Sequence, residues 1–179
     1  MSDNNTIAHL NHNNGFSVGT VQGSTPMSNT KTMFKYLMRV KIGDNCQGTL
    51  PLIGIGRLYK NQNEFNQNKE DTILLDCNNG DLMIVGKKSK YIDGALRKGM
   101  QVDVLLDMKN GVLGFQVDNV FQGVALKNKN LKKGVFHLTV VLNDYAKCGT
   151  SVEVMPYRDE YQIRIESELK RLKEQEAEF

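Results

Sequence analysis

The stretch that decides the fold is Lys98–Leu126, which reads KGMQVDVLLDMKNGVLGFQVDNVFQGVAL. It holds two runs in which apolar residues take every second position: Val102, Val104 and Leu106, and then Leu113, Phe115 and Val117. A period of two places such side chains on one face of a β-strand. Between the runs lies Asn110-Gly111, a pair that readily adopts the positive φ angles of a type I′ turn. The stretch therefore predicts two neighbouring antiparallel strands.

Similar runs extend outward on both sides of this stretch. They span residues 34–42, 52–59, 72–77, 81–86, 121–125, 135–142 and 152–154. In 34–42 the even positions are apolar and three of the four odd positions are basic, which predicts a half-buried strand with its basic residues on the opposite face. Asn79-Gly80 and Asp118-Asn119 supply further turns. About nine short strands with no helix between them predict an all-β, antiparallel sandwich or barrel.

The two ends of the chain differ from the middle. Residues 1–30 are rich in Asn, Ser, Thr and Gly, show no sustained period, and are expected to form an irregular N-terminal tail. Residues 156–179 change period: Tyr161, Ile165, Leu169 and Leu172 recur every three or four residues, which predicts a charged amphipathic α-helix. This helix either packs on the 31–155 domain or docks on a partner.

Composition and charge exclude several classes. The chain has 179 residues and a net charge of +3, made up of −1 over residues 1–30, +6 over 31–155 and −2 over 156–179. No apolar run approaches the ~18 residues needed to cross a bilayer, so no membrane insertion is expected. Three widely spaced cysteines, Cys46, Cys77 and Cys148, argue against a disulfide framework or a zinc site. A reducing, cytoplasmic compartment is the expected location.

The sequence offers no catalytic, metal or cofactor motif. The lone His137 stands among apolar strand residues and is expected to be structural. Asp103 and Asp107 share a strand face but lie about 13 Å apart along it, too far for a glycosidase pair. Lysine clusters at 87–90 and 127–133 make a thin case for nucleic-acid binding, because no aromatic residues are interleaved with them. A solvated surface is the favoured interpretation, and no enzyme is expected.

The Lys98–Leu126 stretch resembles the core signature of the SPRY domain family. In words, that signature is a glycine, a buried strand ending in Asp, a Gly turn, a strand with a central Phe, an Asn-containing turn and Gly-x-Ala. The matching positions are Gly99, Val102, Val104, Leu106, Asp107, Gly111, Leu113, Phe115, Asn119, Gly123 and Ala125. The resemblance continues over the whole of residues 31–155. Met100, Leu126 and the absence of Trp mark a divergent member.

The resemblance implies a two-sheet, jelly-roll-like β-sandwich of the concanavalin type. It also implies a non-enzymatic protein-recognition module, in which loops on a rigid sandwich contact the partner. The expected loops are 43–49, 60–71, 87–97, 127–134 and 143–147. Binding energy concentrates in aromatic and cationic residues, and the amphipathic stripe of 156–179 offers a further contact. The candidate protein-binding residues are Tyr59, Phe65, Lys87, Lys88, Tyr91, Asn143, Tyr145, Ile165, Leu169 and Leu172.

Other proteins are therefore the expected partners, within a hetero-complex. The leading hypothesis is a structural or adaptor subunit of a larger assembly, with cytoskeletal or ciliary association as its most specific form. A substrate-recognition adaptor of a ubiquitin ligase is an alternative within the same class. Lectin-like carbohydrate binding and a nucleic-acid-associated subunit are alternatives from other classes; the first lacks a Trp for stacking and the second lacks interleaved aromatics.

Overall fold

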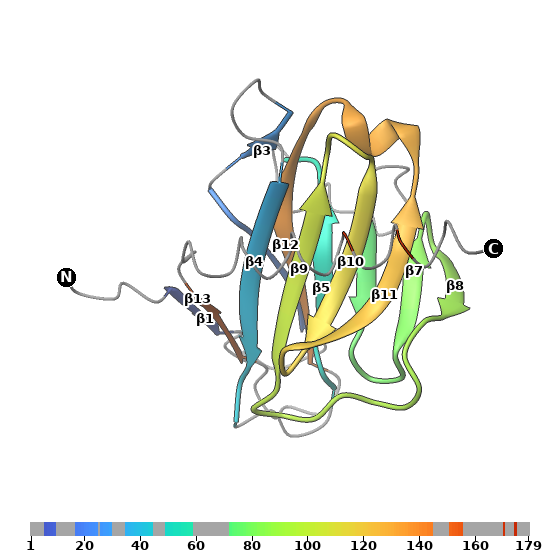
Figure 1. Cartoon of the computed structure of the whole chain (residues 1–179). Helices are drawn as coiled ribbons and strands as arrows, with labels where there is room; N and C mark the ends of the chain where they lie inside the picture. Colours follow the sequence, from blue (N-terminus) through green and yellow to red (C-terminus); the bar gives the residue numbers. More distant parts are fainter. Residues whose placement is uncertain are drawn as a thin grey trace.

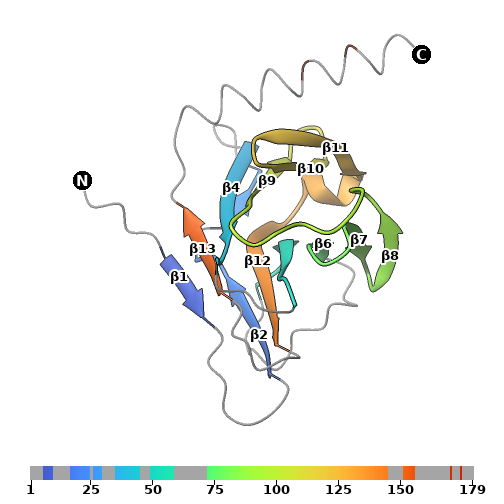
Figure 2. The ribbon, with the colours of Figure 1, turned by 90° about the horizontal axis from the view of Figure 1, so that it is seen from below.

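Two antiparallel β-sheets pack face to face in the computed structural model of the chain (Figures 1 and 2). The structure describes residues 6–9, 17–24, 26–29, 35–44, 49–58, 72–144, 151–155, 170 and 174. The first sheet has the strand order β1-β13-β4-β9-β10-β11. The second has the order β2-β12-β5-β6-β7-β8, with β3 pairing β12 beside it. The predicted all-β sandwich is confirmed.

The strands follow the predicted runs through the middle of the chain. The first sheet consists of β1 (Thr6–His9), β13 (Ser151–Met155), β4 (Lys35–Ile42), β9 (Gln101–Asp107), β10 (Val112–Val117) and β11 (Val120–Lys127). The second consists of β2 (Ser17–Gln22), β12 (Val135–Asp144), β5 (Leu52–Gly56), β6 (Ile73–Asp76), β7 (Asp81–Ile84) and β8 (Lys87–Lys90), with β3 at Met27–Ser28. A short 3₁₀ helix, η2 (Lys129–Lys132), joins β11 to β12.

The core lies between the two inner faces. Aliphatic and aromatic side chains from alternate strand positions form one buried cluster, with Val104, Leu113 and Phe115 from the first sheet and Ile53 and Ile55 from the second all at 0% exposure. Burial of apolar surface stabilises a fold by about 25 cal/mol per Å², so this cluster dominates the stability of the sandwich. The period-two pattern of the sequence therefore predicted correctly which side chains of each strand face the core.

Close approach of two strands explains the glycine pair on β5. A Cβ on Gly54 would lie 2.0 Å from the carbonyl oxygen of Ile73 on β6. Position 54 must therefore be glycine. This confirms the prediction that Gly54-x-Gly56 marks close packing of strands.

Two hairpins share the pattern Asp-x-x-Asn-Gly, at 76–80 between β6 and β7 and at 107–111 between β9 and β10. In each, the glycine N–H donates to the aspartate carbonyl oxygen at 2.8 Å, and the glycine φ is positive, at 77° and 71°. The aspartate carboxylate accepts a backbone N–H from inside the loop at 3.1 Å or 3.0 Å. The hairpins are thus confirmed, but the predicted type I′ turns are wrong here. These are four-residue loops closed by one left-handed glycine.

Tight two-residue turns occur elsewhere. Asp118-Asn119 has φ angles of 48° and 66° between β10 and β11, and Val85-Gly86 has 53° and 71° between β7 and β8. Both are the signature of a type I′ turn. Val85 is a β-branched residue in the left-handed region, which costs free energy that Asn or Gly would not.

The N-terminal segment contains strands where an irregular tail was expected. Strand β1 pairs with β13, β2 pairs with β12 along six residues, and β3 adds two more pairs to β12. Met27 is buried in the core, at 1% exposure. The segment has no strong hydrophobic period because its strands add to sheet edges, where backbone hydrogen bonds rather than a continuous apolar face hold them.

Strand β4 also departs from expectation, because Arg39 is 6% exposed although it points away from the core. Its Nε and Nη2 donate to Oδ1 and Oδ2 of Asp103 at 2.5 Å and 2.6 Å, and Nη2 also donates to Oδ1 of Asn119 at 2.8 Å. Arg39 and Asp103 are direct cross-strand partners, so the register of β4 and β9 places the opposite charges together. The predicted face is therefore right for Arg39, but its side chain is buried there in an ion pair rather than exposed to solvent.

A small apolar cluster lies next to this ion pair. Leu37 and Leu105 are the neighbouring cross-strand pair, both buried, and Phe121 of β11 packs on them. A Cβ on Gly114 would lie 2.9 Å from the Phe121 ring, so glycine at this position lets the ring lie across β10. The outward face of the first sheet is thus buried at its centre.

The expected helix over 156–179 falls almost wholly outside the described residues. Only Lys170 and Glu174 are described there. Both have helical backbone, and their side chains lie 3.9 Å apart as an exposed i,i+4 pair. The helix stays a prediction.

The buried ion pair gives a first prediction. Replacing Arg39→Met leaves Asp103 charged and buried without its partner, which should lower the free energy of unfolding by about 3–5 kcal/mol. The double variant Arg39→Met/Asp103→Leu should recover most of this loss, because no charge is then left in the site. Urea denaturation of the two variants measures both values. A single variant no less stable than the double one would contradict the role given to the pair.

Candidate functional site

Most of the candidate binding residues lie outside the part of the chain that the structure describes. These are Tyr59, Phe65, Tyr145, Ile165, Leu169 and Leu172. Asn143 lies in β12, where its backbone pairs with Val18, and its side chain is not described. Their role in binding stays a prediction, and the described surface is built from Lys87, Lys88, Tyr91 and residues that the sequence did not single out.

Tyr91 ties the free edges of the two sheets together. It follows β8, at the edge of the second sheet, and its hydroxyl donates to the carbonyl oxygen of Gly123 on β11 at 2.6 Å. The hydroxyl oxygen of Tyr91 accepts a hydrogen bond from the N–H of Phe115 at 3.3 Å, and the rings of Tyr91 and Phe115 meet edge to face at a centroid distance of 5.8 Å. Burial raises the pKa of Tyr91 to about 12. These contacts give Tyr91 a structural role, and partner binding by it stays a prediction.

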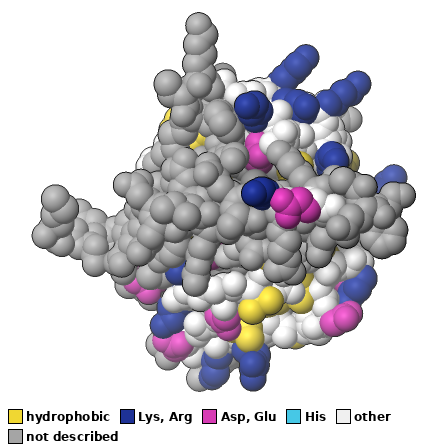
Figure 3. All heavy atoms as spheres, viewed as in Figure 1, with side chains coloured by type: hydrophobic (Ala, Val, Ile, Leu, Met, Phe, Trp, Pro, Cys, Tyr) yellow, Lys and Arg dark blue, Asp and Glu magenta, His cyan; other side chains and the backbone are white. Residues whose placement is uncertain are grey.

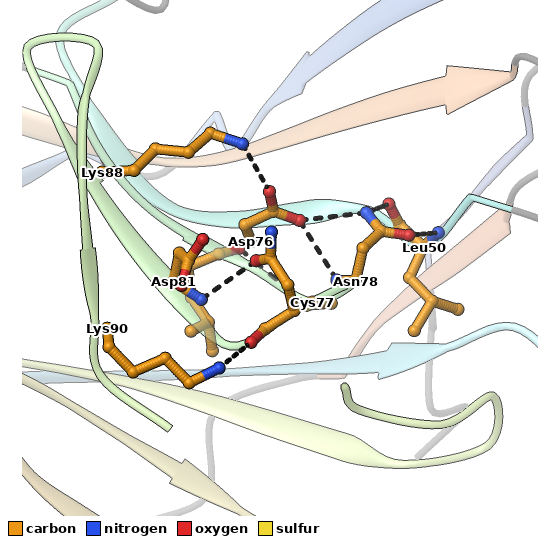
Figure 4. A network of polar contacts seen from close by, with 9 residues as sticks. Leu50, Asp76, Cys77, Asn78, Asp81, Lys88 and Lys90 are labelled. Carbon is orange, nitrogen blue, oxygen red and sulfur yellow. Dashed lines mark hydrogen bonds and ion pairs between the residues drawn. The ribbon is translucent and has the colours of Figure 1, made fainter. Parts of the chain in front are cut away.

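Lys87 and Lys88 lie on strand β8 rather than in the expected loop. Lys88 pairs with Asp76 at 3.0 Å, and Lys90 donates to the carbonyl oxygen of Asn79 at 2.5 Å, so both reach the 76–80 loop (Figure 4). Lysines on an edge strand also hinder pairing with another chain, which is a physical reason for a four-residue strand of this composition. Lys87 is the exposed residue next to the Val85-Gly86 turn.

Asp76 organises the turn that Lys88 reaches. Its Oδ1 accepts from the N–H and the Nδ2 of Asn78, which in turn bonds both backbone groups of Leu50 (Figure 4). Burial alone would raise the pKa of Asp76, but the hydrogen bonds from Asn78 and Lys88 outweigh it and hold the pKa below its usual value. This carboxylate is therefore a structural anion.

The other end of the sandwich gathers several segments into one surface, here named the η2-end surface. It comprises residues 57–58 after β5, 85–87 around the β7–β8 turn, 109–111 in the β9–β10 loop, and 127–135 from the end of β11 to the start of β12 (Figure 1). The register places Ile84 level with Ile73 and Ile55, so the β7–β8 turn lies beside the end of β5. The N–H of Asn128 donates to the carbonyl oxygen of Gly111 at 2.9 Å, which joins the β9–β10 loop to η2.

This surface is strongly basic. Its segments carry seven cations and no Asp or Glu: Arg57, Lys87, Lys109, Lys127, Lys129, Lys132 and Lys133. Dark-blue side chains accordingly line the upper right edge of the molecule in Figure 3. A cluster of one sign raises the local concentration of oppositely charged groups and speeds their encounter with the protein.

Helix η2 holds three of these lysines outward. The Asn128 side chain caps it by accepting the N–H of Asn130 at 2.9 Å, and Leu131 anchors it in the core at 2% exposure. Residues i and i+3 eclipse in a 3₁₀ helix, so Lys129 and Lys132 project from the same side. Lys133 follows directly and is exposed.

Aliphatic side chains are exposed on the same surface. Leu58 is 63% exposed, Val135 44% and Val85 37%, three of the four exposed large hydrophobics found among the described residues. The Arg57 guanidinium lies 5.9 Å from the centre of the Phe136 ring, and an added Cβ on Gly134 would contact it. The surface thus combines cations with exposed apolar area, a mixture typical of protein-binding sites.

Sequence reasoning found only part of this surface. It noticed the 127–133 lysines and favoured a solvated surface for them. It missed Arg57, Leu58 and Val135, because Arg57 and Leu58 follow β5 whereas Val135 begins β12, far along the chain; only the lone Leu131 among lysines and asparagines hinted at an anchored helix. His137, expected to be structural, lies 2.8 Å from the Gly23 carbonyl oxygen through its Nδ1, which must therefore carry the proton.

Known proteins match this chain by structure and not by sequence. No protein-family model and no curated protein matches the sequence. Among solved structures, the SPRY domain of human HERC1 superimposes with a TM-score of 0.65 at 17% identity, covering 84% of this chain and 89% of that one. A second human SPRY domain superimposes with a TM-score of 0.59 at 14% identity, covering 80% and 88%. The chain has the SPRY fold.

The SPRY signature positions take the places that the resemblance implied. Val104, Leu106, Leu113 and Phe115 are fully or almost fully buried on β9 and β10. Three signature glycines, Gly99, Gly111 and Gly123, have φ angles of 81°, 71° and 96°, a conformation that favours glycine. In the fold, the apolar positions of the signature are therefore buried strand residues, and its glycines have left-handed backbone conformations.

The described residues contain neither a candidate metal site nor a candidate membrane-spanning helix. No group of three or more His, Cys, Asp or Glu in them is placed to hold a metal ion. No helix in the same residues is long and apolar enough to cross a membrane.

The lowered pKa of Asp76 predicts a dependence of stability on acid. A carboxylate with a folded-state pKa below its unfolded value of 3.8 stabilises the fold above that pH and loses this contribution as the pH falls through the folded-state pKa. Asp76→Asn should cost about 1 kcal/mol at neutral pH and flatten the loss of unfolding free energy in acid. Denaturation at a series of acidic pH values measures this. Asp93→Asn, at an exposed carboxylate, is the control and should leave the slope unchanged.

The raised pKa of Tyr91 predicts that stability is also lost at alkaline pH. The unfolded chain ionises near pH 10 and the folded one near pH 12, so this contribution is present below pH 10 and lost as the pH rises through about 12. Tyr91→Phe should remove that alkaline loss, at a cost of about 1 kcal/mol near neutrality from the missing hydrogen bonds. Tyrosinate absorbance should show one late-titrating group fewer. An unchanged titration would contradict the assignment.

Proposed function

We propose that the protein is a non-enzymatic protein–protein interaction module that serves as a structural or adaptor subunit of a larger assembly. The observation that carries the proposal is the η2-end surface, where exposed Leu58 and Val135 stand among seven cations on a rigid β-sandwich. Rigid strands position these side chains before a partner arrives, which reduces the entropy lost on binding. The SPRY fold supports the same class of function.

The three buried aspartates of the described residues are engaged in structure. Asp103 holds Arg39, Asp76 holds Lys88 and Asn78, and Asp107 accepts from Asn110 at 3.0 Å and 2.6 Å. Each is buried and each stabilises a strand pair or a loop. This supports a binding role.

The more specific form of the proposal is a cytoplasmic assembly with cytoskeletal or ciliary association. Its support comes from the sequence, in which a charged, amphipathic segment of residues 156–179 follows the domain. Such a segment can lie along a neighbouring protein. Its candidate contacts are Ile165, Leu169 and Leu172, together with Tyr59, Phe65 and Tyr145 in the loops.

Isolation of the tagged full chain from its native source tests the proposal. Partner proteins should co-purify in fixed stoichiometry through size-exclusion chromatography, and lysine crosslinks should connect them to the domain. The triple variant Ile165→Ser/Leu169→Ser/Leu172→Ser should reduce recovery of a partner that contacts the C-terminal segment. Recovery of the chain only as a monomer, with no crosslinked partner, would overturn the proposed function.

A further inference from the structure

The like charges on η2 are held close together by the fold. The side chains of Lys129 and Lys132 lie one above the other on the same side of the 3₁₀ helix, and Lys133 follows directly. Burial of Leu131 fixes the orientation of the helix, so these lysines stay close to one another. Like charges at such spacing repel by a few tenths of a kcal/mol per pair. The segments of the η2-end surface contain no carboxylate to offset this repulsion. An anionic group brought by a partner would relieve it.

The apolar part of the surface identifies the kind of anion. Val135 directly follows Gly134, where an added Cβ would lie 3.2–3.4 Å from the Arg57 guanidinium, and Leu58 is the next residue after Arg57. Aliphatic side chains therefore stand immediately beside the cations. A partner that covers this surface must present apolar and anionic groups in alternation, as a protein segment does.

A nucleic acid fits this surface less well. Single-stranded nucleic acids bind proteins through bases stacked on exposed aromatic rings. Among the residues that the structure describes here, the nearest aromatic ring is that of Phe136, next to Val135, which is 2% exposed and has the Arg57 guanidinium 5.9 Å from its centre. The exposed apolar groups of the described residues at this surface are aliphatic, so these residues offer no platform for base stacking.

We propose that the η2-end surface binds an acidic segment of a partner protein, with carboxylates of that segment on Lys129, Lys132 and Lys133 and an aliphatic side chain on Leu58 and Val135. The inference rests on the proposed function, because it names the chemistry of the partner that the module recognises. Binding should weaken steeply with salt, since exposed charges are screened over about 8–10 Å at physiological ionic strength.

A pair of matched charge reversals tests the proposal. Lys129→Glu/Lys133→Glu changes the η2-end surface, and Arg97→Glu/Lys98→Glu makes the same change of net charge at two exposed residues of the 91–100 loop at the opposite end. Purified full-length proteins are titrated with a short fluorescent peptide rich in glutamate and leucine, and separately with a single-stranded oligodeoxynucleotide. The first variant should weaken peptide binding by at least about tenfold, whereas the second should leave it within about twofold.

A second variant reports on the apolar contact. Leu58→Ser/Val135→Thr keeps every charge and should also weaken binding of the glutamate–leucine peptide, but not binding of a peptide in which leucine is replaced by glutamine. Thermal unfolding of each variant confirms that it is folded. Equal effects of the two charge reversals, tighter binding of the oligonucleotide than of the peptide, or no effect of the aliphatic variant would overturn the inference.

The native complex separates this inference from the proposed function. If partners co-purify equally with the wild-type chain and with Lys129→Glu/Lys133→Glu, the module binds through another surface and only the inference fails. If no partner co-purifies with the wild-type chain, the proposed function itself fails.

Discussion

Packing of the two inner sheet faces against each other is the interaction on which the rest of the structure depends. Neither sheet is stable alone, because each has one face of Val, Leu, Ile and Phe that water disfavours. Phe115 lies at the middle of this contact with no exposed surface, and Tyr91 meets its ring where the sheet edges converge. The loops and turns that the structure describes are then attached to one end or the other of this sandwich.

That rigidity explains why polar groups are found buried at particular places. Arg39 and Asp103 are tolerated on the outward face because the strand register brings them together with bidentate geometry. Asp76 and Asp107 close equivalent loops, one on each sheet, by accepting hydrogen bonds that the loop backbone would otherwise lack. Seven cations lie in the segments of the η2-end surface, four of them between Lys127 and Lys133.

The sequence predicted the strands of the middle region well because one face of each is buried, and burial writes a period of two into the chain. It predicted hairpins from Asn79-Gly80 and Asn110-Gly111, but not their loop length. The aspartate three positions before each asparagine adds a hydrogen bond that favours a four-residue loop. It did not predict β1, β2 and β3, whose pairing depends on exposed edges of sheets that exist only after the domain has folded.

By itself, then, the sequence determined the fold class, the positions of the core residues and the resemblance to SPRY domains, since these depend on local periodicity and on residues close together in one stretch. Only the tertiary structure decided which segments share an end of the sandwich. Arg57 and Phe136 are distant along the chain, and the guanidinium lies 5.9 Å from the centre of the ring because β5 and β12 pair antiparallel with Gly56 opposite His137. Strand register of this kind is set by packing across the whole domain. No local sequence pattern therefore predicts which residues it brings together at this surface.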